Sequence, residues 1–315
     1  MKDKVVLCYG GIAMDSVVIL PYAPKPGIAH IICEEYNRLG GGAAHVAEWL
    51  GSWNIPTRLA GYALGNDQYG AQLWKWLQHY PAIDLSHVLQ GDEWKTLVSR
   101  SIPMPDGNRY LLCSDYAKAD FSPVTEALFQ DVKLLEAAFY YRNEHGNEIA
   151  DIVVRMAYER RIPITAMDIV LPEQPSARLA GIILNSAASI REQIGDFQTE
   201  AYCRKMHEVN HGVVIVTDGS RPVLTIDEDG SMFSAQPPTV VTTDTTGAGD
   251  SFRAGMIYGV RHGWPLERSL RWAVAVSALQ VQRPLDQRDL PSEAQIAALA
   301  ETIELSKVSQ PTRTK

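Results

Sequence analysis

The sequence has 315 residues with 29 Lys and Arg against 37 Asp and Glu, a formal net charge of −8 that disfavours binding to nucleic acids or anionic membrane surfaces. Hydrophobic residues make up 46% and charged residues 21%, values that argue against disorder, and no apolar run reaches transmembrane length. The four cysteines are widely separated without a CxxC pair, which argues against a zinc site or disulfide framework and favours the reducing cytoplasm.

Short aliphatic runs alternate with amphipathic segments along the chain. Val5–Tyr9, Ile162–Met167 and Val213–Thr217 are expected to be strands. Asp67–Tyr80 and Asn147–Arg160 carry apolar residues at helical spacing, and Asp67 is expected to cap the first of these helices. This alternation predicts a single α/β domain over 1–315, with a mostly parallel central sheet covered by helices on both faces. In such sheets ligands bind beyond the carboxyl ends of the strands.

Two regions interrupt the alternation, and we expect them to form a small antiparallel sheet that acts as a lid. Residues 16–38 are strand-like with prolines in the middle, and residues 96–114 read as two strands joined at 105–108. Such a sheet, exposed on one side, could cover a ligand or pair with another subunit. Its apolar residues favour a homodimer formed through the lid; they are Val17, Ile19, Ile31 and Cys33.

The segment TTDTTGAGDSF, residues 242–252, holds the pattern with the clearest chemistry. Gly247, Ala248 and Gly249 precede Asp250, and apolar residues at helical spacing follow it. The free N–H groups at the start of that helix would face outward and, without bulky side chains, could approach a negatively charged group. In isolation, Gly-Ala-Gly-Asp would favour a tight turn with a capping aspartate. The second carboxylate at Asp244 and the following helix favour phosphoryl transfer, with Asp250 accepting a proton from the attacking hydroxyl.

Residues 244–250, DTTGAGD, match in full the D-T-x-G-A-G-D signature of the ribokinase-like carbohydrate kinases, also called the PfkB family, which this sequence closely resembles. The resemblance extends to RLGGGAAHVAEWL at 38–50 and GNDQYG at 65–70. It implies a ribokinase-like three-layer α/β/α fold with a β-sheet lid, ATP and Mg²⁺ as cosubstrate and cofactor, and Asp250 as the catalytic base. The backbone of 247–249 would then form the anion hole.

The same resemblance implies roles for residues elsewhere in the chain. Asp15 matches the aspartate that binds substrate hydroxyls, and the glycines Gly40, Gly41 and Gly42 would let substrate lie against the backbone. Asp168 falls where the family carries an aspartate after a strand. The positions expected on the nucleotide side are Asn185, Thr217, Gly219, Asp244, Thr245 and Val274.

Three departures from the family pattern bear on the metal and the substrate. The glutamate of the family's N-x-x-E element is replaced by Ala188, with Glu192 one helical turn further on, so the metal ligands are unknown. His45 stands where the family has asparagine and could face the sugar or be structural. The segment after Arg283 lacks the family's glycine, so a monovalent cation site is not supported.

The sequence narrows the substrate only to a class. Asn143 and Glu144 follow a predicted strand and suit hydroxyl groups, while Arg109 in the lid could bind an anionic group. A sugar or polyol is therefore favoured as the phosphoryl acceptor. A nucleoside kinase of the same family, or a non-catalytic sugar- or nucleotide-binding regulator, remains an alternative.

Overall fold

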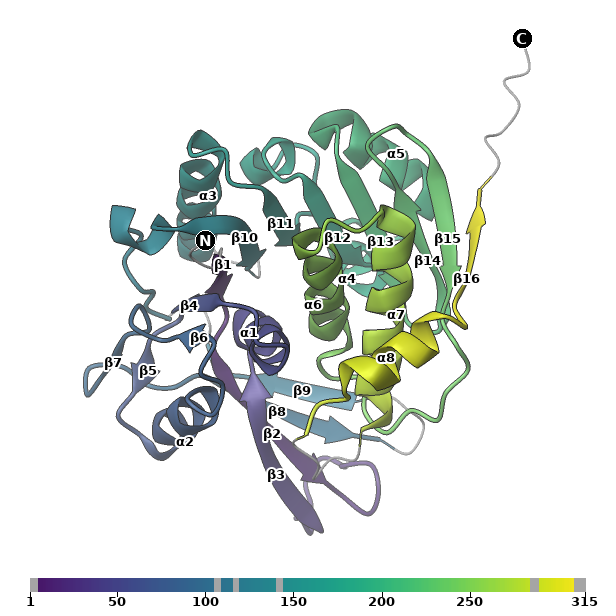
Figure 1. The fold of residues 1–315 in the computed structure, drawn as a ribbon. Coiled ribbons are helices and arrows are strands. Elements are labelled where there is room, and N and C mark those ends of the chain that lie inside the picture. Colours follow the sequence, from purple (N-terminus) through teal and green to yellow (C-terminus); the bar gives the residue numbers. More distant parts are fainter. Residues whose placement is uncertain (1–4, 105–108, 116–118, 140–143, 284–288, 309–315) are drawn as a thin grey trace.

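The structure is a computed structural model, and it describes residues 5–104, 109–115, 119–139, 144–283 and 289–308 (Figure 1). Most strands of this part of the chain belong to one large sheet. They are β1 (Val5–Gly10), β4 (Thr57–Gly61), β6 (Ile83–Asp84), β10 (Val132–Ala138), β11 (Ile164–Met167), β12 (Ile182–Ser186), β13 (Val213–Asp218), β14 (Arg221–Ile226), β15 (Met232–Gln236) and β16 (Glu304–Lys307). Their order across the sheet is β16-β15-β14-β13-β12-β11-β10-β1-β4-β6.

The strands from β13 to β6 are parallel to their neighbours, whereas β14, β15 and β16 are antiparallel. The mostly parallel sheet predicted from the alternation is confirmed. Because the central strands run the same way, the carboxyl ends of β1, β10, β11, β12 and β13 lie along one edge. The final strand β16 was not predicted; it pairs with β15 and covers the edge of the sheet.

Helices cover both faces of the sheet. On one face lie α1 (Gly42–Ser52), α6 (Ala248–Arg261), α7 (Leu266–Gln282) and α8 (Glu293–Ala300); on the other lie α3 (Glu144–Glu159), α4 (Ala187–Ile194) and α5 (Thr199–Asn210) (Figure 1). Two short 3₁₀ helices span Glu126–Phe129 and Pro175–Arg178. The result is the predicted three-layer α/β/α arrangement.

Helix α2 (Gln68–Leu77) begins where the sequence predicts. The Asp67 side chain accepts hydrogen bonds from the N–H groups of Tyr69 and Gly70 at 3.0 and 2.9 Å, which satisfies two backbone donors of the first turn. A third bond, from the Thr96 N–H at 2.9 Å, ties the cap to the chain that enters the lid. The apolar residues Leu73 and Leu77 are buried on the inner face.

The lid is a separate four-stranded sheet in the order β3-β2-β8-β9. Its strands are β2 (Ala13–Ile19), β3 (Glu34–Gly40), β8 (Val98–Pro103) and β9 (Arg109–Cys113). The hairpins β2–β3 and β8–β9 are antiparallel as predicted, but β2 and β8 run parallel where the hairpins meet. Residues 20–33 between β2 and β3 form neither helix nor strand. A further pair, β5 (Leu64–Gly65) and β7 (Gln90–Gly91), is short and parallel.

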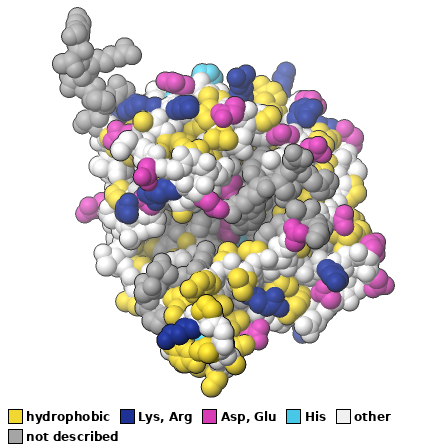
Figure 2. Space-filling view, turned by 180° about the vertical axis from the view of Figure 1, so that it is seen from behind, with side chains coloured by type: hydrophobic (Ala, Val, Ile, Leu, Met, Phe, Trp, Pro, Cys, Tyr) yellow, Lys and Arg dark blue, Asp and Glu magenta, His cyan; other side chains and the backbone are white. Residues whose placement is uncertain are grey.

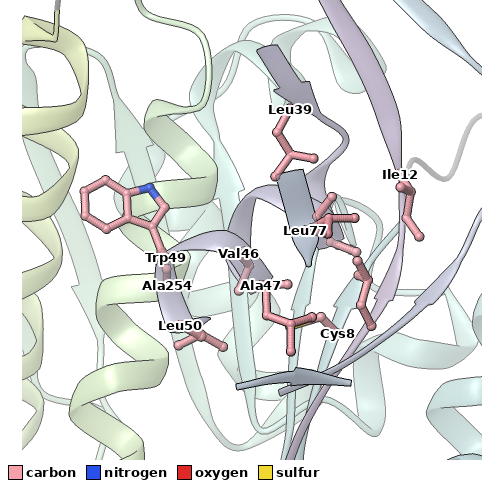
Figure 3. Packing of buried hydrophobic residues seen from close by; sticks show 14 of the residues in the cluster. Cys8, Ile12, Leu39, Val46, Ala47, Trp49, Leu50, Leu77 and Ala254 are labelled. Atoms are coloured by element: carbon pink, nitrogen blue, oxygen red, sulfur yellow. The ribbon is translucent and has the colours of Figure 1, made fainter. Parts of the chain in front are cut away.

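Close packing of α1 against α6 positions the site. Val46, Ala47, Trp49 and Leu50 of α1 are buried in one hydrophobic cluster with Ala254 of α6 (Figure 3). Because alanine side chains are short, the two helices approach closely along this contact. Their N-terminal ends, one following the lid strand β3 and the other following the glycine-rich segment, therefore meet.

Candidate active site

Asp250 lies in the first turn of α6, three residues after the helix cap. Gly247 is that cap, with φ of 77°, a left-handed conformation that glycine adopts without strain. A Cβ on Gly247 would also lie 3.0 Å from Nδ1 of His45, so the residue must be small as well as flexible. These constraints explain the glycine by geometry and bring the start of α6 against α1.

Both oxygens of the Asp250 carboxylate are hydrogen-bonded. Oδ2 accepts from Nδ1 of His45 at 2.8 Å, and Oδ1 accepts from Nη2 of Arg253 at 2.6 Å. Burial by itself raises the pKa of Asp250, but the His45 hydrogen bond and the charge of Arg253 outweigh it and lower the pKa to about 2. Asp250 is therefore a carboxylate at neutral pH, with lone pairs that can still accept a further hydrogen bond.

His45 is held between two acceptors. Its Nδ1 faces Asp250 and its Nε2 faces the backbone carbonyl of Leu39, and only a doubly protonated imidazolium donates to both. Burial alone lowers the pKa of His45, but the hydrogen bond to Asp250 and the charges of Asp250, Asp15 and Glu48 raise it to about 9. His45 therefore places a positive charge beside Asp250.

Arg253 and Glu136, which no motif in the sequence indicates, form a buried ion pair next to Asp250. Nη1 of Arg253 donates to Oε1 of Glu136, and the side chains are only 3% and 0% exposed. Thr165 of β11 donates its hydroxyl to the other oxygen of Glu136. Neither residue stands out in the sequence, because each element carries other charges: Lys133 in β10, and Asp250 and Arg261 in α6.

The backbone before Asp250 has space for a ligand. The Ala248 N–H donates to the Thr245 carbonyl at 3.2 Å, so this group is already engaged in a turn. Within the described residues, no backbone carbonyl accepts from the N–H of Gly247 or Gly249. A Cβ built on Gly249 meets no atom within 4 Å, so the chain there faces open space. Two of the three predicted anion-hole donors are thus available.

The glycines at 40–42 are explained by contacts within the protein. A Cβ on Gly40 would lie 2.4 Å from Oδ1 of Asp15, and one on Gly41, whose φ is 86°, would lie 2.4 Å from the Gly11 carbonyl oxygen. A Cβ on Gly42 would lie 2.8 Å from Nη2 of Arg253. The run therefore lets the lid strand, the end of β1 and the start of α1 approach one another, whatever contact it makes with substrate.

Asp15 and Asp244 each contact the lid strand β3. Asp15 is buried on β2, against Gly40, and its charge raises the pKa of His45. Asp244 accepts a 2.5 Å hydrogen bond from Nη2 of Arg38, on the lid strand β3. Its other oxygen accepts from the N–H and hydroxyl of Thr246, each at 3.0 Å. Asp244 therefore organises the loop before α6 and links it to the lid.

The residues expected on the nucleotide side lie in different environments, some at the carboxyl edge of the sheet and others buried. Thr217 is the second-last residue of β13, and Gly219, with φ of 62°, makes the turn into β14 at the carboxyl edge of the sheet. Thr245 is exposed in the loop before α6. Asn185 is buried and donates to the Ile169 carbonyl at 2.7 Å and to the Tyr202 hydroxyl at 2.8 Å. Val274 is buried in the cluster under α6 and α7.

Asp168 follows β11 with φ of 56° and accepts a hydrogen bond from the Ser189 hydroxyl at 2.7 Å. Ala188 and the exposed Glu192 lie on α4. In the described part of the chain, no three His, Cys, Asp or Glu side chains gather as metal ligands. Of the remaining predicted residues, Asn143 lies outside the described residues, and only the backbone of Glu144 (start of α3) and Arg109 (start of β9) is described.

A cavity of about 1070 Å³ adjoins the centre. It is lined by residues of β3, α1, α2 and the end of α7, among them His45, Arg38, Tyr36, Trp49 and Trp76. Neither Asp15 nor Asp250 is part of this lining, so the cavity touches the centre through His45 without containing the carboxylates.

Solved structures share this architecture of a three-layer domain with a small sheet at one edge. Ribokinase from Arabidopsis thaliana, complexed with ribose and ATP, superposes with a TM-score of 0.76 at 20% identity, covering 96% of this chain and 99% of that one. A nucleoside kinase from Methanocaldococcus jannaschii gives a TM-score of 0.74 at 18% identity, covering 95% and 98%. The fold is ribokinase-like.

The sequence model of the pfkB family of carbohydrate kinases matches residues 5–293, and the chain belongs to this family. Among curated relatives, the bifunctional protein HldE of Azorhizobium caulinodans is 24% identical over 280 residues, which cover 84% of this chain. The chain spans 57% of the length of that relative. None of the helices in the described ranges is both long and apolar enough to cross a membrane.

Proposed function

We propose that the protein is a cytoplasmic, ATP-dependent kinase that phosphorylates a primary hydroxyl group of a sugar or polyol. The observation that carries the proposal is Asp250, a half-buried carboxylate at the start of α6, next to the open backbone at Gly249 in a chain of the pfkB family. A base and an anion-binding backbone lie within one helical turn. An attacking hydroxyl and a transferring phosphoryl group have to meet in such a place.

In the proposed reaction, the acceptor hydroxyl donates a hydrogen bond to Asp250. Its oxygen attacks the terminal phosphorus of ATP, the bond from that phosphorus to the bridging oxygen breaks, and ADP leaves. The hydroxyl proton passes to Asp250 as the new bond forms, because the hydroxyl becomes acidic only then; the pKa of Asp250, about 2, makes it a weak base for a free alcohol. The N–H groups of Gly247 and Gly249 would stabilise charge on the transferring phosphoryl group.

The binding roles expected from the sequence remain part of the proposal. Asp15, beside Gly40 at the base of the lid, is assigned to substrate hydroxyls, and Thr217 and Gly219 at the carboxyl edge are assigned to the nucleotide. Mg²⁺ would be held mainly by the phosphate oxygens of ATP and by water, an arrangement that needs few protein ligands.

The test is ATP turnover across a panel of sugars, polyols and nucleosides with Mg²⁺, using the Asp250→Asn variant as the control. We expect phosphorylation of at least one sugar or polyol and a kcat about 10²-fold or more lower in the variant, with ligand binding retained. Turnover restricted to nucleosides would favour a nucleoside kinase, the alternative suggested by the fold shared with the Methanocaldococcus jannaschii enzyme. Binding without turnover would favour a regulator.

We also propose that two copies associate through the lid. Apolar side chains are exposed on the loop at 20–33 and on β9, and yellow atoms gather at the lower end of the molecule, where the lid lies (Figure 2). Of the four residues predicted for this face, Ile31 is 72% exposed and Cys33 is exposed, whereas Val17 is buried and Ile19 half-buried. Light scattering of the protein should give twice the monomer mass, and Ile31→Lys should shift it towards the monomer. A monomeric wild type would end this part of the proposal.

A further inference from the structure

We propose that Arg253 is a positioning residue for Asp250 and that Glu136 holds the Arg253 guanidinium in place for this task. The inference rests on the proposed kinase function and adds to it two buried residues that the sequence pattern did not indicate. Neither side chain is placed against substrate. Both would act through the carboxylate of Asp250.

The guanidinium of Arg253 connects three elements under the centre. Nη2 donates to Oδ1 of Asp250 at 2.6 Å, on the same helix, and to the Gly42 carbonyl at 3.4 Å, at the start of α1. Nη1 donates to Glu136 of β10. A planar guanidinium with donors in a rigid fork can hold these directions at once, which a single ammonium group cannot.

Burial makes the two charges depend on each other. A fully buried Glu136 without Arg253, or a buried Arg253 without Glu136, would be an unpaired charge in a low-dielectric interior. The Thr165 hydroxyl adds a hydrogen bond to Glu136 from the neighbouring strand. The chain of contacts therefore runs from the central sheet through Glu136 and Arg253 to Asp250, and ends at His45.

Gly42 fits this role. A Cβ at this position would lie 2.8 Å from Nη2 of Arg253 and 3.5 Å from Oδ1 of Asp250. The third glycine of the run is therefore required for the guanidinium to reach Asp250. This contact also offers a way to disturb Arg253 without changing any charge.

The consequence for Asp250 is a fixed carboxylate plane. Arg253 holds Oδ1 and His45 holds Oδ2 from the opposite helix, so rotation of the carboxylate breaks one bond or the other. The charged groups around the Asp250 carboxylate and His45 come from four elements. They are Arg253 on α6, Glu48 on α1, Glu136 on β10 and Asp15 on β2. A small misplacement of a reacting group costs a large factor in rate, so the fixed plane should appear in kcat rather than in KM.

The experiment compares Arg253→Met and Arg253→Lys with wild type over a pH series. For Arg253→Met we expect kcat to fall about 10²-fold with KM within about 3-fold, and the acid limb of the pH profile to move to higher pH because a positive charge beside Asp250 is gone. Arg253→Lys keeps the charge but not the fork, so we expect an acid limb near that of wild type and a kcat about 10-fold lower. Gly42→Ala should resemble Arg253→Met in kcat but keep the wild-type acid limb.

A double variant separates positioning from simple charge neutralisation. Arg253→Met together with Glu136→Met removes both buried charges and should fold at least as well as the single variant. If Arg253 only neutralises Glu136, the double variant recovers kcat; if Arg253 positions Asp250, the thermal midpoint recovers and kcat stays low. Recovery of kcat to within 3-fold of wild type, or an Arg253→Lys variant identical to wild type in kcat and pH profile, would overturn the inference.

The kinase function and the positioning role of Arg253 would be contradicted by different results. If wild type turns over no substrate in the panel, the kinase function fails and the Arg253 variants have nothing to report. If wild type turns over and Asp250→Asn does not, while the Arg253 variants behave as wild type, only the positioning role fails. Arg58→Met is the matched control. It removes a 2.9 Å ion pair between Arg58 and Asp84, which does not contact Asp250, and it should leave kcat unchanged.

Discussion

Arg38 on the lid strand β3 donates a 2.5 Å hydrogen bond to Asp244 in the loop before α6, and this ion pair joins the lid to the segment that carries the proposed catalytic backbone. The Asp244 side chain is 6% exposed and Arg38 is 22% exposed, so the pair is mostly shielded from water. Burial alone raises the pKa of Asp244, but the charge of Arg38 and the Thr246 hydrogen bonds outweigh it and lower the pKa. The loop therefore depends on a residue of the lid.

Removing this link should reduce both stability and activity. Arg38→Met leaves Asp244 without its ionic partner, and we expect the free energy of unfolding to fall by about 1–3 kcal/mol, between the values for exposed and buried pairs. The kcat should fall about 10-fold because the loop before α6 loses one of its anchors. Urea denaturation and steady-state kinetics measure the two effects. Arg58→Met should lose stability without losing kcat; equal loss of kcat in both variants would contradict a specific role for Arg38.

The ion pair of Arg38 and Asp244 predicts that activity depends little on the monovalent cation present. Both oxygens of Asp244 are engaged, one by Arg38 and the other by Thr246, so the carboxylate already has a cationic partner from the protein. Replacing K⁺ by Na⁺ or tetramethylammonium at constant ionic strength should change the wild-type kcat by less than about 2-fold. In Arg38→Met, added K⁺ should restore part of the lost activity. Strong K⁺ dependence of wild type would refute this reading of Asp244.

The pair of His45 and Asp250 predicts a pH dependence of stability. The pKa of His45 is about 9 in the folded protein against an ordinary value of 6.5. Its contribution is therefore complete below about 6.5 and is lost as the pH rises through 9, with an upper limit of about 3 kcal/mol. The pKa of Asp250, about 2 against 3.8, is lowered, so its contribution is present above 3.8 and is lost as the pH falls through about 2.

Urea denaturation of wild type at pH 6 and pH 9.5 checks the basic side of this prediction. We expect the free energy of unfolding to be lower at pH 9.5, and His45→Gln to lose most of the difference because glutamine does not titrate. His207→Gln, on α5 and away from the centre, is the control and should retain the wild-type slope. An unchanged slope in His45→Gln would show that other groups cause the dependence.

Two glycines of α6 predict opposite results for the same substitution. Gly249 faces open space, so Gly249→Ala should keep or slightly raise the thermal midpoint, since alanine favours a helix, but its methyl group would occupy the space proposed for the phosphate. We expect kcat/KM for ATP to fall about 10²-fold or more. A Cβ on Gly259 would lie 2.2 Å from the Ser269 hydroxyl oxygen, so Gly259→Ala should destabilise by about 1–3 kcal/mol and leave kcat unchanged. Normal kinetics in Gly249→Ala would remove the anion-hole assignment.

Local patterns were sufficient to predict much of the frame. The Asp67 cap of α2, the strand after residue 4, the hairpin within 96–114 and the helix that follows the glycine-rich segment each depend on neighbouring residues, and each is observed. The environments of the residues assigned from the family motif could not be predicted in this way, because a motif match carries no information on packing. Asn185 is engaged by Ile169 and Tyr202, and Val274 lies in the core.

The surroundings of Asp250 required the folded chain. The contacts of Asp250 with His45, of Arg253 with Glu136 and of Arg38 with Asp244 join residues 205, 117 and 206 positions apart. Periodicity and turn chemistry act over a few residues, so they carry no information on such pairs. The sequence by itself determined the α/β class and the helix start that holds Asp250. Only the tertiary structure, through the close packing of α1 on α6 over β10, decided that His45 of α1 and the buried Arg253 of α6 each hold one oxygen of this carboxylate.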